Sequence, residues 1–534
     1  MRAERLFRVL GLVDPALVEE ALETRRRASW RCWAALAACL ALVLSLGWMA
    51  TGGFRGYKSG MSGGSPSSAP TGDSGGAPAD SAPASPGATG ESGGVENGIT
   101  FMSYAGPVLP LTTLEDAALT AERTVTWDFA PGTNSHGERR QWGARVTDAY
   151  VLTNPTEEDV TVTALYPFAG SFSELAEIMP AVTVDGKAAE TVLYAGPYSG
   201  GFQSAFGAEE PDTMNLEALN SWRAYKALLE GGEYLEQALG DYPALDTPVT
   251  VYEFSDFAAP HDKYQAATQA VSFSIDEAAT QVLTYGFNGG EWGEGFRRYS
   301  YFVPDGKRHE PDLKLLVVLG EDIGPCDLQG YRDGGCDAGE EIEGVSCTVR
   351  RAETTMDAVL DRLCTYCRER CAGDRAADRD SAFDAVPLEM YRGAVAELLC
   401  QYGALSAAPM DRYQDGRLDD MLAETLHHER VLYLSFPVTA PAGGSAAVAC
   451  AAWKEPSYDF GCSGSGNEDL QGYDLTTRLG SALAFTRQSA ALVNAENVEI
   501  TGQDFGFAPE DGALSVELDL EREHYYLEIR PIEE

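Results

Sequence analysis

Three cysteines with helical spacing are the first residues whose pattern could do chemistry. Cys364, Cys367 and Cys371 follow one another at intervals of three and four residues, which places their side chains on one face of a helix. Thiolates grouped in this way could bind zinc with a fourth ligand, but no nearby histidine completes a known zinc spacing. Apolar residues before them continue the same face. We therefore expect core residues or disulfide partners, with free thiols or a zinc site as alternatives.

An acidic, glycine-containing loop is the second candidate site. Hard oxygen ligands on a flexible loop could bind calcium. The spacing departs from the 12-residue calcium-binding loop, because Gln329 and Tyr331 occupy its third and fifth positions. A calcium site and a solvated acidic turn remain the alternatives, and we predict no cofactor. The carboxylates of this loop are Asp327, Asp333, Asp337 and Glu340.

The remaining motifs give little support for catalysis. His427-His428-Glu429 lacks the H-E-x-x-H spacing of a zinc protease. Residues 60–64 match G-x-S-x-G, but they lie in a spacer without the strand and helix that a nucleophile elbow needs. Asp and Glu number 82, so close carboxylate pairs are inevitable and uninformative. These observations favour a non-catalytic role and leave a carboxylate-based hydrolase as an alternative.

The charge balance restricts the possible partners. Lys and Arg number 39 against the 82 acidic residues, which gives a formal net charge of −43. Such a field repels phosphate backbones, so we exclude nucleic acid as a partner. A hydrophobic share of 44% is typical of a chain that folds around apolar cores.

One segment predicts a membrane anchor. Residues 32–50 are nineteen consecutive residues without charge, enough at about 1.5 Å per residue to cross a hydrocarbon core of about 30 Å. Tryptophans lie at both ends, where the headgroups would be. Seven arginines precede the segment and only two basic residues follow it closely. The sequence therefore predicts a single-pass signal-anchor in the cell membrane, with the N-terminus cytoplasmic and the C-terminal region extracytoplasmic.

The segments on either side of this anchor differ in composition. Residues 1–31 form a short cytoplasmic stub with a helix start at Asp14-Pro15. The stub is either a helix resting on lipid or a docking element for a cytoplasmic protein. Residues 51–98 contain a run, 60–94, that is almost only Gly, Ser, Ala, Pro and Thr, so we expect a disordered linker over 51–98.

The rest of the chain is expected to be α+β and mostly β, with β-sandwich-like extracytoplasmic modules and a helical insert. Period-2 alternation predicts the strands, and 3.6-residue spacing predicts helices. The expected regions are a first β domain (99–210), a helix with a second β region (211–350), a helical insert (351–430) and a C-terminal β region (431–534). Strands are expected at 144–154, 159–168, 181–187 (ending in an Asp-Gly turn), 247–254, 270–275, 281–287, 298–303, 313–319, 431–437, 446–453, 498–502, 514–520 and 524–529. Helices are expected at 216–239, 353–371, 388–402 and 417–429.

One five-residue sequence occurs twice. DLQGY spans 327–331 and again 469–473. Each copy follows a strand that ends in Phe or Pro and then an apolar strand. Two hypotheses remain open, namely two diverged copies of one β unit, or coincidence between turn-rich loops.

Two stretches resemble known families. The opening LFRVLGLVDPALVEEALE, followed by a basic stretch and WAALAACLALVL, resembles bacterial membrane-anchored anti-sigma-type regulators. That resemblance implies an inner segment that holds a transcription factor and an outer domain that senses envelope conditions. Residues 148–186, with DAYVLTNPTEEDVTVTALYPFAG and VTVDGK, resemble the strand pair of vault/inter-alpha-trypsin-type β-sandwiches. This second resemblance implies a domain used in protein contacts.

These features lead to one leading hypothesis about function. We expect a membrane-anchored extracytoplasmic protein that senses or binds a protein or glycan outside the cell, and that signals to a cytoplasmic partner through its N-terminal stub. The alternatives are a cell-envelope hydrolase and a structural surface protein.

Overall fold

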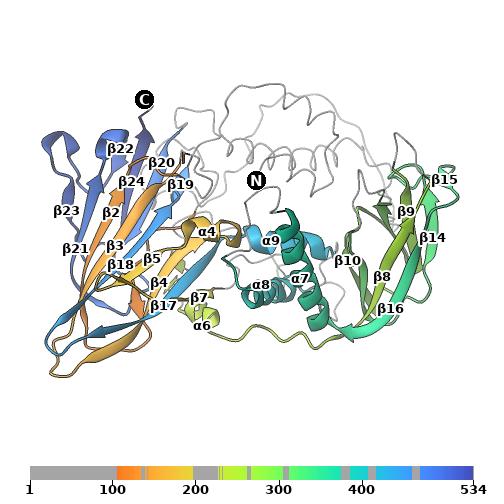
Figure 1. The fold of residues 1–534 in the computed structure, drawn as a ribbon, viewed down its shortest axis with the longest axis horizontal. Coiled ribbons are helices and arrows are strands. Elements are labelled where there is room, and N and C mark those ends of the chain that lie inside the picture. Colours follow the sequence, from red (N-terminus) through yellow and green to blue (C-terminus); the bar gives the residue numbers. More distant parts are fainter. Residues whose placement is uncertain are drawn as a thin grey trace, which may run out of the picture.

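The computed structural model shows a mostly β protein with a helical layer (Figure 1). The fold class expected from the sequence, α+β with mostly β structure, is confirmed. The stub 1–31, the anchor 32–50 and the linker 51–98 lie outside the described residues. None of the described helices combines the length and apolar character that a membrane span requires. The structure describes residues 105–133, 139–140, 142–196, 226–227, 229–230, 232–260, 266–304, 312–374, 385–406, 416–459 and 469–532.

The first β-sandwich combines strands from both ends of the described chain. Its early strands are β1 (Thr112–Thr113), β2 (Thr120–Asp128), β3 (Ala144–Thr153), β4 (Val160–Gly170), β5 (Ala181–Val184), β6 (Lys187–Ala188) and β7 (Val192–Ala195). Its late strands are β17 (Arg430–Ala440), β18 (Ser445–Lys454), β19 (Tyr458–Asp459), β20 (Gln471–Thr476), β21 (Ala484–Val493), β22 (Val498–Gln503), β23 (Ser515–Glu517) and β24 (His524–Pro531). Short helical segments connect some of them, namely η1 (Phe172–Glu174), α4 (Leu175–Ile178), η3 (Ala495–Asn497) and η4 (Pro509–Asp511), and α6 (Glu233–Ala238) follows β7.

A seven-stranded sheet forms one layer of this sandwich, in the order β23-β21-β2-β3-β18-β5-β6. The opposite layer consists of two four-stranded sheets, β1-β4-β17-β7 and β19-β20-β24-β22. Alternate residues of β2, such as Ala121, Val125 and Trp127, are buried in the interior, as period-2 strands require. The regions expected at 99–210 and 431–534 therefore contribute strands to the same sheets, through long-range pairs that sequence patterns do not specify.

The second β-sandwich lies within the chain between β7 and β17. Its strands are β8 (Pro248–Ala258), β9 (Thr268–Ser274), β10 (Thr280–Tyr285), β11 (Gly289–Gly293), β12 (Phe296–Phe302), β13 (Lys314–Gly320), β14 (Asp327–Tyr331), β15 (Glu341–Ile342) and β16 (Ser346–Thr355). They form two facing sheets, β10-β13-β8-β16 and β11-β12-β9-β14-β15. An aromatic core fills the space between them, in which the rings of Phe254, Phe287 and Tyr301 contact one another.

Three helices cover the outer face of the sheet β10-β13-β8-β16. They are α7 (Met356–Asp374), α8 (Leu388–Gln401) and α9 (Leu418–His427), and they lie between the two sandwiches (Figure 1). Because helices cover one face and the aromatic core the other, β13 is buried on both sides and reads as a continuous apolar run. Phe172 and Leu175 of the first sandwich belong to the same apolar cluster. The helical layer therefore joins the two sandwiches.

The two sandwiches share a strand arrangement. In the first, β3-β18-β5 faces β4-β17-β7, and in the second, β8-β13-β10 faces β9-β12-β11. Within these six strands each neighbouring pair is antiparallel, and the chain visits equivalent positions in the same order. The repeated Gln-Gly-Tyr follows in β14 of the second sandwich, and in β20 of the first after the short strand β19. The two copies are paired differently, because β14 pairs with β9, whereas β20 pairs with β24 and not with β4. This arrangement supports the hypothesis of two diverged copies of one β unit.

Several local features differ from the sequence expectations. The strands β2, β14 and β21 were not expected, and of the helix expected at 216–239, much of which lies outside the described residues, the last turns form α6 (Glu233–Ala238). The helix expected from residue 353 begins at Met356, because Glu353 to Thr355 complete the strand β16. We missed β16 because it lacks an alternating apolar face, since nearly all of its side chains are exposed. β3 and β4, expected as a strand pair, lie in facing sheets and do not form a hairpin.

Candidate functional site

An open groove with a volume of about 780 Å³ lies between α7 and β8. This volume lies within the range of ligand-binding clefts, about 300–1,000 Å³. We call it the α7–β8 groove. Its lining residues are Glu253, Phe254, Ser255, Asp256, Phe257, Pro304, Asp312, Leu313, Asp361, Arg362, Thr365, Tyr366 and Glu369.

Regular secondary structure positions both walls of the groove. Asp361, Thr365 and Glu369 are four residues apart on α7, so their side chains lie along one face of the helix. On the opposite wall, β8 contains an irregularity where it pairs with the start of β16. Asp256 lies there with a φ of 52°, in the left-handed region that aspartate adopts more readily than most residues. Such irregularities redirect side chains at the edge of a sheet.

Ion pairs fix the groove's walls to each other. Arg362 donates two hydrogen bonds to the Glu253 carboxylate, at 3.1 and 2.7 Å. Tyr366 donates to the Asp312 carboxylate, which also pairs with Arg370, and the backbone N–H of Leu313 donates to the Tyr366 hydroxyl at 3.2 Å. Burial and the bond to Asp312 raise the pKa of Tyr366. The groove is therefore a preformed feature of the α7–β8 packing.

The groove's lining is strongly acidic. Five carboxylates contribute to it, from Glu253, Asp256, Asp312, Asp361 and Glu369, against one guanidinium from Arg362. A cleft lined by one sign of charge concentrates ligands of the opposite sign. Phe257 and Leu313, both partly exposed, add apolar surface. The arrangement suits an extended ligand that carries positive charge and some apolar groups.

A second pocket contains groups whose pKa values are more strongly shifted, but its volume is smaller. Burial lowers the pKa of Lys454 to about 8, and burial together with nearby Glu174 raises the pKa of Glu429 well above its usual value. Perturbed groups in a cleft often mark functional sites. This cavity, however, measures about 40 Å³, which is room for one or two water molecules. Size therefore favours the α7–β8 groove.

A buried carboxyl on α8 makes stability depend on pH. Burial raises the pKa of Glu397 from 4.5 to about 7, opposed by attraction to Arg430. Between these values the folded state keeps a proton that the unfolded state loses, so its stabilising contribution is complete below pH 4.5 and is lost as pH rises to 7. We expect Glu397→Gln to raise the free energy of unfolding by about 1–3 kcal/mol at pH 8 and to leave it unchanged at pH 4. Urea denaturation at the two pH values measures this.

The matched control for this prediction is Glu389→Gln, which removes an exposed carboxylate from the same helix. It should alter stability little at either pH. An equal gain from Glu397→Gln at pH 4 and pH 8 would contradict the assignment, because a proton-linked effect must disappear when both states are protonated.

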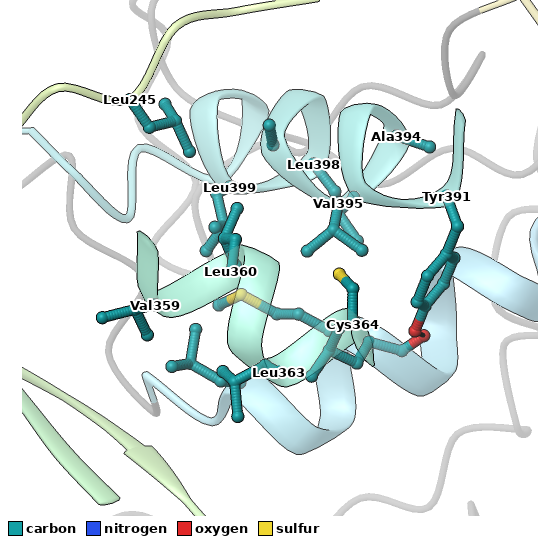
Figure 2. Close-up of a cluster of buried hydrophobic side chains, with 14 of the residues drawn as sticks. Leu245, Val359, Leu360, Leu363, Cys364, Tyr391, Ala394, Val395, Leu398 and Leu399 are labelled. Atoms are coloured by element: carbon teal, nitrogen blue, oxygen red, sulfur yellow. Dashed lines mark hydrogen bonds between the residues drawn. The ribbon is translucent and has the colours of Figure 1, made fainter. Parts of the chain in front are cut away.

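The three cysteines that we considered as zinc ligands belong to the helical layer. Cys364 is fully buried, and its thiol points toward α8 near Val395 (Figure 2). Cys367 lies on the sheet side, with its sulfur 3.7 Å from the Tyr285 hydroxyl. The side chain of Cys371 lies outside the described residues. Within the described part of the chain, no group of three His, Cys, Asp or Glu side chains is placed to hold a metal ion.

The four carboxylates of the acidic loop are also spread apart. Asp327 begins β14, whereas Asp333, Asp337 and Glu340 lie in the connection to β15. Two of them come near one glycine, since a Cβ on Gly335 would lie 3.4 Å from Asp337 Oδ2 and 3.9 Å from Asp333 Oδ2. The described structure thus brings two of the four toward one point and leaves Asp327 elsewhere.

Comparison with known proteins adds no relatives: neither the family models nor the curated proteins include a match to this chain. The groove is therefore interpreted from its own geometry. Our sequence reasoning did not find it, because its walls come from segments more than fifty residues apart. The only sequence signal was the placement of Asp361 and Glu369 on the polar face of the predicted helix.

Proposed function

We propose that the protein is a membrane-anchored extracytoplasmic binding protein whose α7–β8 groove binds a positively charged segment of another protein. The predicted anchor 32–50 and linker 51–98 would hold the two sandwiches at a distance from the membrane. The stub 1–31 would bind a cytoplasmic partner when the protein signals inward.

The observation that carries this proposal is the combination of the groove's size and charge. A volume of about 780 Å³ accommodates several side chains of an extended peptide. Five carboxylates against one arginine favour Lys or Arg in that peptide, and the ion pair between Glu253 and Arg362 leaves Asp256, Asp361 and Glu369 to receive them. Electrostatic attraction of this kind determines specificity and association rate more than raw affinity.

A binding experiment on the full-length chain in detergent tests this function. The probe is a fluorescein-labelled decapeptide of alternating lysine and leucine, and fluorescence anisotropy measures its dissociation constant. We expect Asp361→Asn combined with Glu369→Gln to weaken binding about 5–30-fold at low salt, since each lost partly exposed contact is worth about 0.5–1 kcal/mol. Binding should weaken as ionic strength rises.

The matched control removes two carboxylates from the first sandwich, Glu496→Gln with Glu499→Gln, and keeps the same net charge as the groove variant. This control should bind the peptide within about twofold of the native chain. Any remaining difference from long-range electrostatic attraction should disappear as salt is added. If the groove variant and the control bind equally well, the peptide does not occupy the groove. A peptide with glutamate in place of lysine should not bind.

A further inference from the structure

The wall of the α7–β8 groove that α7 forms contains the same acidic–basic pair twice. Asp361-Arg362 is the first pair, and Glu369-Arg370 follows eight residues later. A rise of about 1.5 Å per residue separates the two pairs by about 12 Å along the helix. Thr365 lies midway, one turn from each acidic residue and on the same face of α7. We call the acidic members, Asp361 and Glu369, the open carboxylates.

The basic member of each pair is bound to the facing wall. Arg362 donates to both carboxylate oxygens of Glu253, and Arg370 pairs with Asp312. The open carboxylates are exposed and, among the described residues, form no ion pair with either arginine. The helix therefore presents two acidic positions to a ligand, with an uncharged position between them.

The groove has room for one extended chain between its walls. Arg362 and Tyr366 reach directly from α7 to carboxylates on the facing wall, so the two walls are one side chain apart where these pairs form. An extended chain lies about 4.8 Å from its neighbour, whereas a helix needs about 8–10 Å between its axis and that of α7. An extended segment is therefore the occupant that fits beside these pairs.

The open carboxylates are spaced like alternate residues of an extended chain. Such a chain rises about 3.3 Å per residue and alternates its side chains, so residues i, i+2 and i+4 share one side. Residues i and i+4 are then about 13 Å apart, close to the separation of about 12 Å between the open carboxylates. The side chain of residue i+2 would lie opposite Thr365. Leu313, whose backbone N–H donates to Tyr366, provides apolar surface on the facing wall there.

We infer that the segment bound in the α7–β8 groove is extended and carries two basic residues four positions apart, with an uncharged residue midway. This inference rests on the proposed function and adds the register in which the ligand lies. One basic residue pairs with Asp361 and the other with Glu369. Basic residues three or five positions apart point to opposite sides of an extended chain, so only one of them can reach an open carboxylate. The site thus selects the spacing of positive charges as well as their number.

Peptides that differ only in the spacing of two lysines test this inference. Each is a fluorescein-labelled decapeptide of threonine in which the lysines are two, three, four, five or eight positions apart, and fluorescence anisotropy measures its binding to the full-length chain in detergent. All carry the same charge, so their long-range attraction to the protein is equal. The peptide with lysines four apart should bind about 2–5-fold more tightly than those with lysines three or five apart, which lose one partly exposed ion pair.

Double-mutant cycles assign each lysine to its carboxylate. Replacement of one lysine of this peptide by glutamine should be coupled to Asp361→Asn alone, and replacement of the other to Glu369→Gln alone. Which lysine is coupled to which carboxylate gives the direction of the bound chain. The matched control is Glu499→Gln, which removes an exposed carboxylate from β22 of the first sandwich and should be coupled to neither lysine. Equal coupling of each open carboxylate to both lysines would contradict the register.

The peptide series also separates failure of the register from failure of the proposed function. If the alternating lysine–leucine peptide binds in the groove but lysine spacing has no effect, the register is wrong and the proposed function stands. Tightest binding with lysines eight apart would indicate a helical ligand and would likewise overturn the register. If none of the peptides binds, both the register and the proposed function are wrong.

Discussion

Replacement of Asp148 by alanine should lower the free energy of unfolding by about 3–5 kcal/mol, because it leaves the Arg123 charge buried without its partner. Both side chains are completely buried. Arg123 donates to both carboxylate oxygens of Asp148, at 2.9 and 2.8 Å, and to the Thr476 carbonyl at 2.6 Å. The Tyr150 hydroxyl donates to Asp148 at 2.6 Å. Urea denaturation followed by tryptophan fluorescence measures the loss.

Two further variants show whether the charge is the cause. Arg123→Met combined with Asp148→Ala removes the isolated charge and should be more stable than Asp148→Ala alone. Glu517→Ala breaks an exposed pair with Arg487 and should leave the unfolding midpoint almost unchanged. A double variant as unstable as the single one would show that the Asp148 hydrogen bonds matter more than the charge.

Replacement of Leu360 by alanine should lower the free energy of unfolding by about 2–5 kcal/mol, because it opens a cavity in the helical layer. Leu360 is fully buried on α7 among Leu398, Leu399 and Val395 of α8 (Figure 2). The same apolar cluster includes residues of both sandwiches. Differential scanning calorimetry should therefore show a lower transition temperature for the whole described unit.

The control is Leu328→Ala, which truncates a leucine that is 37% exposed on β14. It should shift the transition by less than about a quarter of the Leu360→Ala effect, because water already surrounds part of the side chain. A similar shift for both variants would show that the helical layer relaxes to fill the space.

The sequence predicted local structure better than tertiary arrangement. The helices expected at 388–402 and 417–429 correspond to α8 and α9, and the apolar run at 313–319 corresponds to β13. The two helices show a 3.6-residue apolar period because one face of each packs in a core, and β13 is apolar throughout because both of its faces are buried. β16 carries no such signal, and its side chains are exposed on both faces.

Long-range strand pairing explains why the tertiary arrangement could not be predicted from the sequence. The parallel register between β2 and β21 joins residues more than 350 positions apart, and nothing in either strand specifies the other. The α7–β8 groove depends on the same kind of pairing, since strands β9 to β16 separate β8 from α7 in the chain and β16, which precedes α7, pairs with β8. The cysteine pattern correctly predicted one face of a helix, because Cys364 continues the apolar stripe of Leu360 and Leu363 on α7.

The position of the second sandwich within the first has an evolutionary consequence. The chain leaves the first sandwich after β7 and returns at β17, two neighbouring strands of one sheet. The equivalent neighbours in the second sandwich, β11 and β12, are joined by a tight turn at Glu294-Gly295. A second sandwich inserted into such a hairpin turn leaves the strand pairing intact, because the two strands on either side of the insertion still lie next to each other. On the hypothesis of two diverged copies of one β unit, the ancestor was a single sandwich, and the second sandwich arose by insertion of one copy into the other.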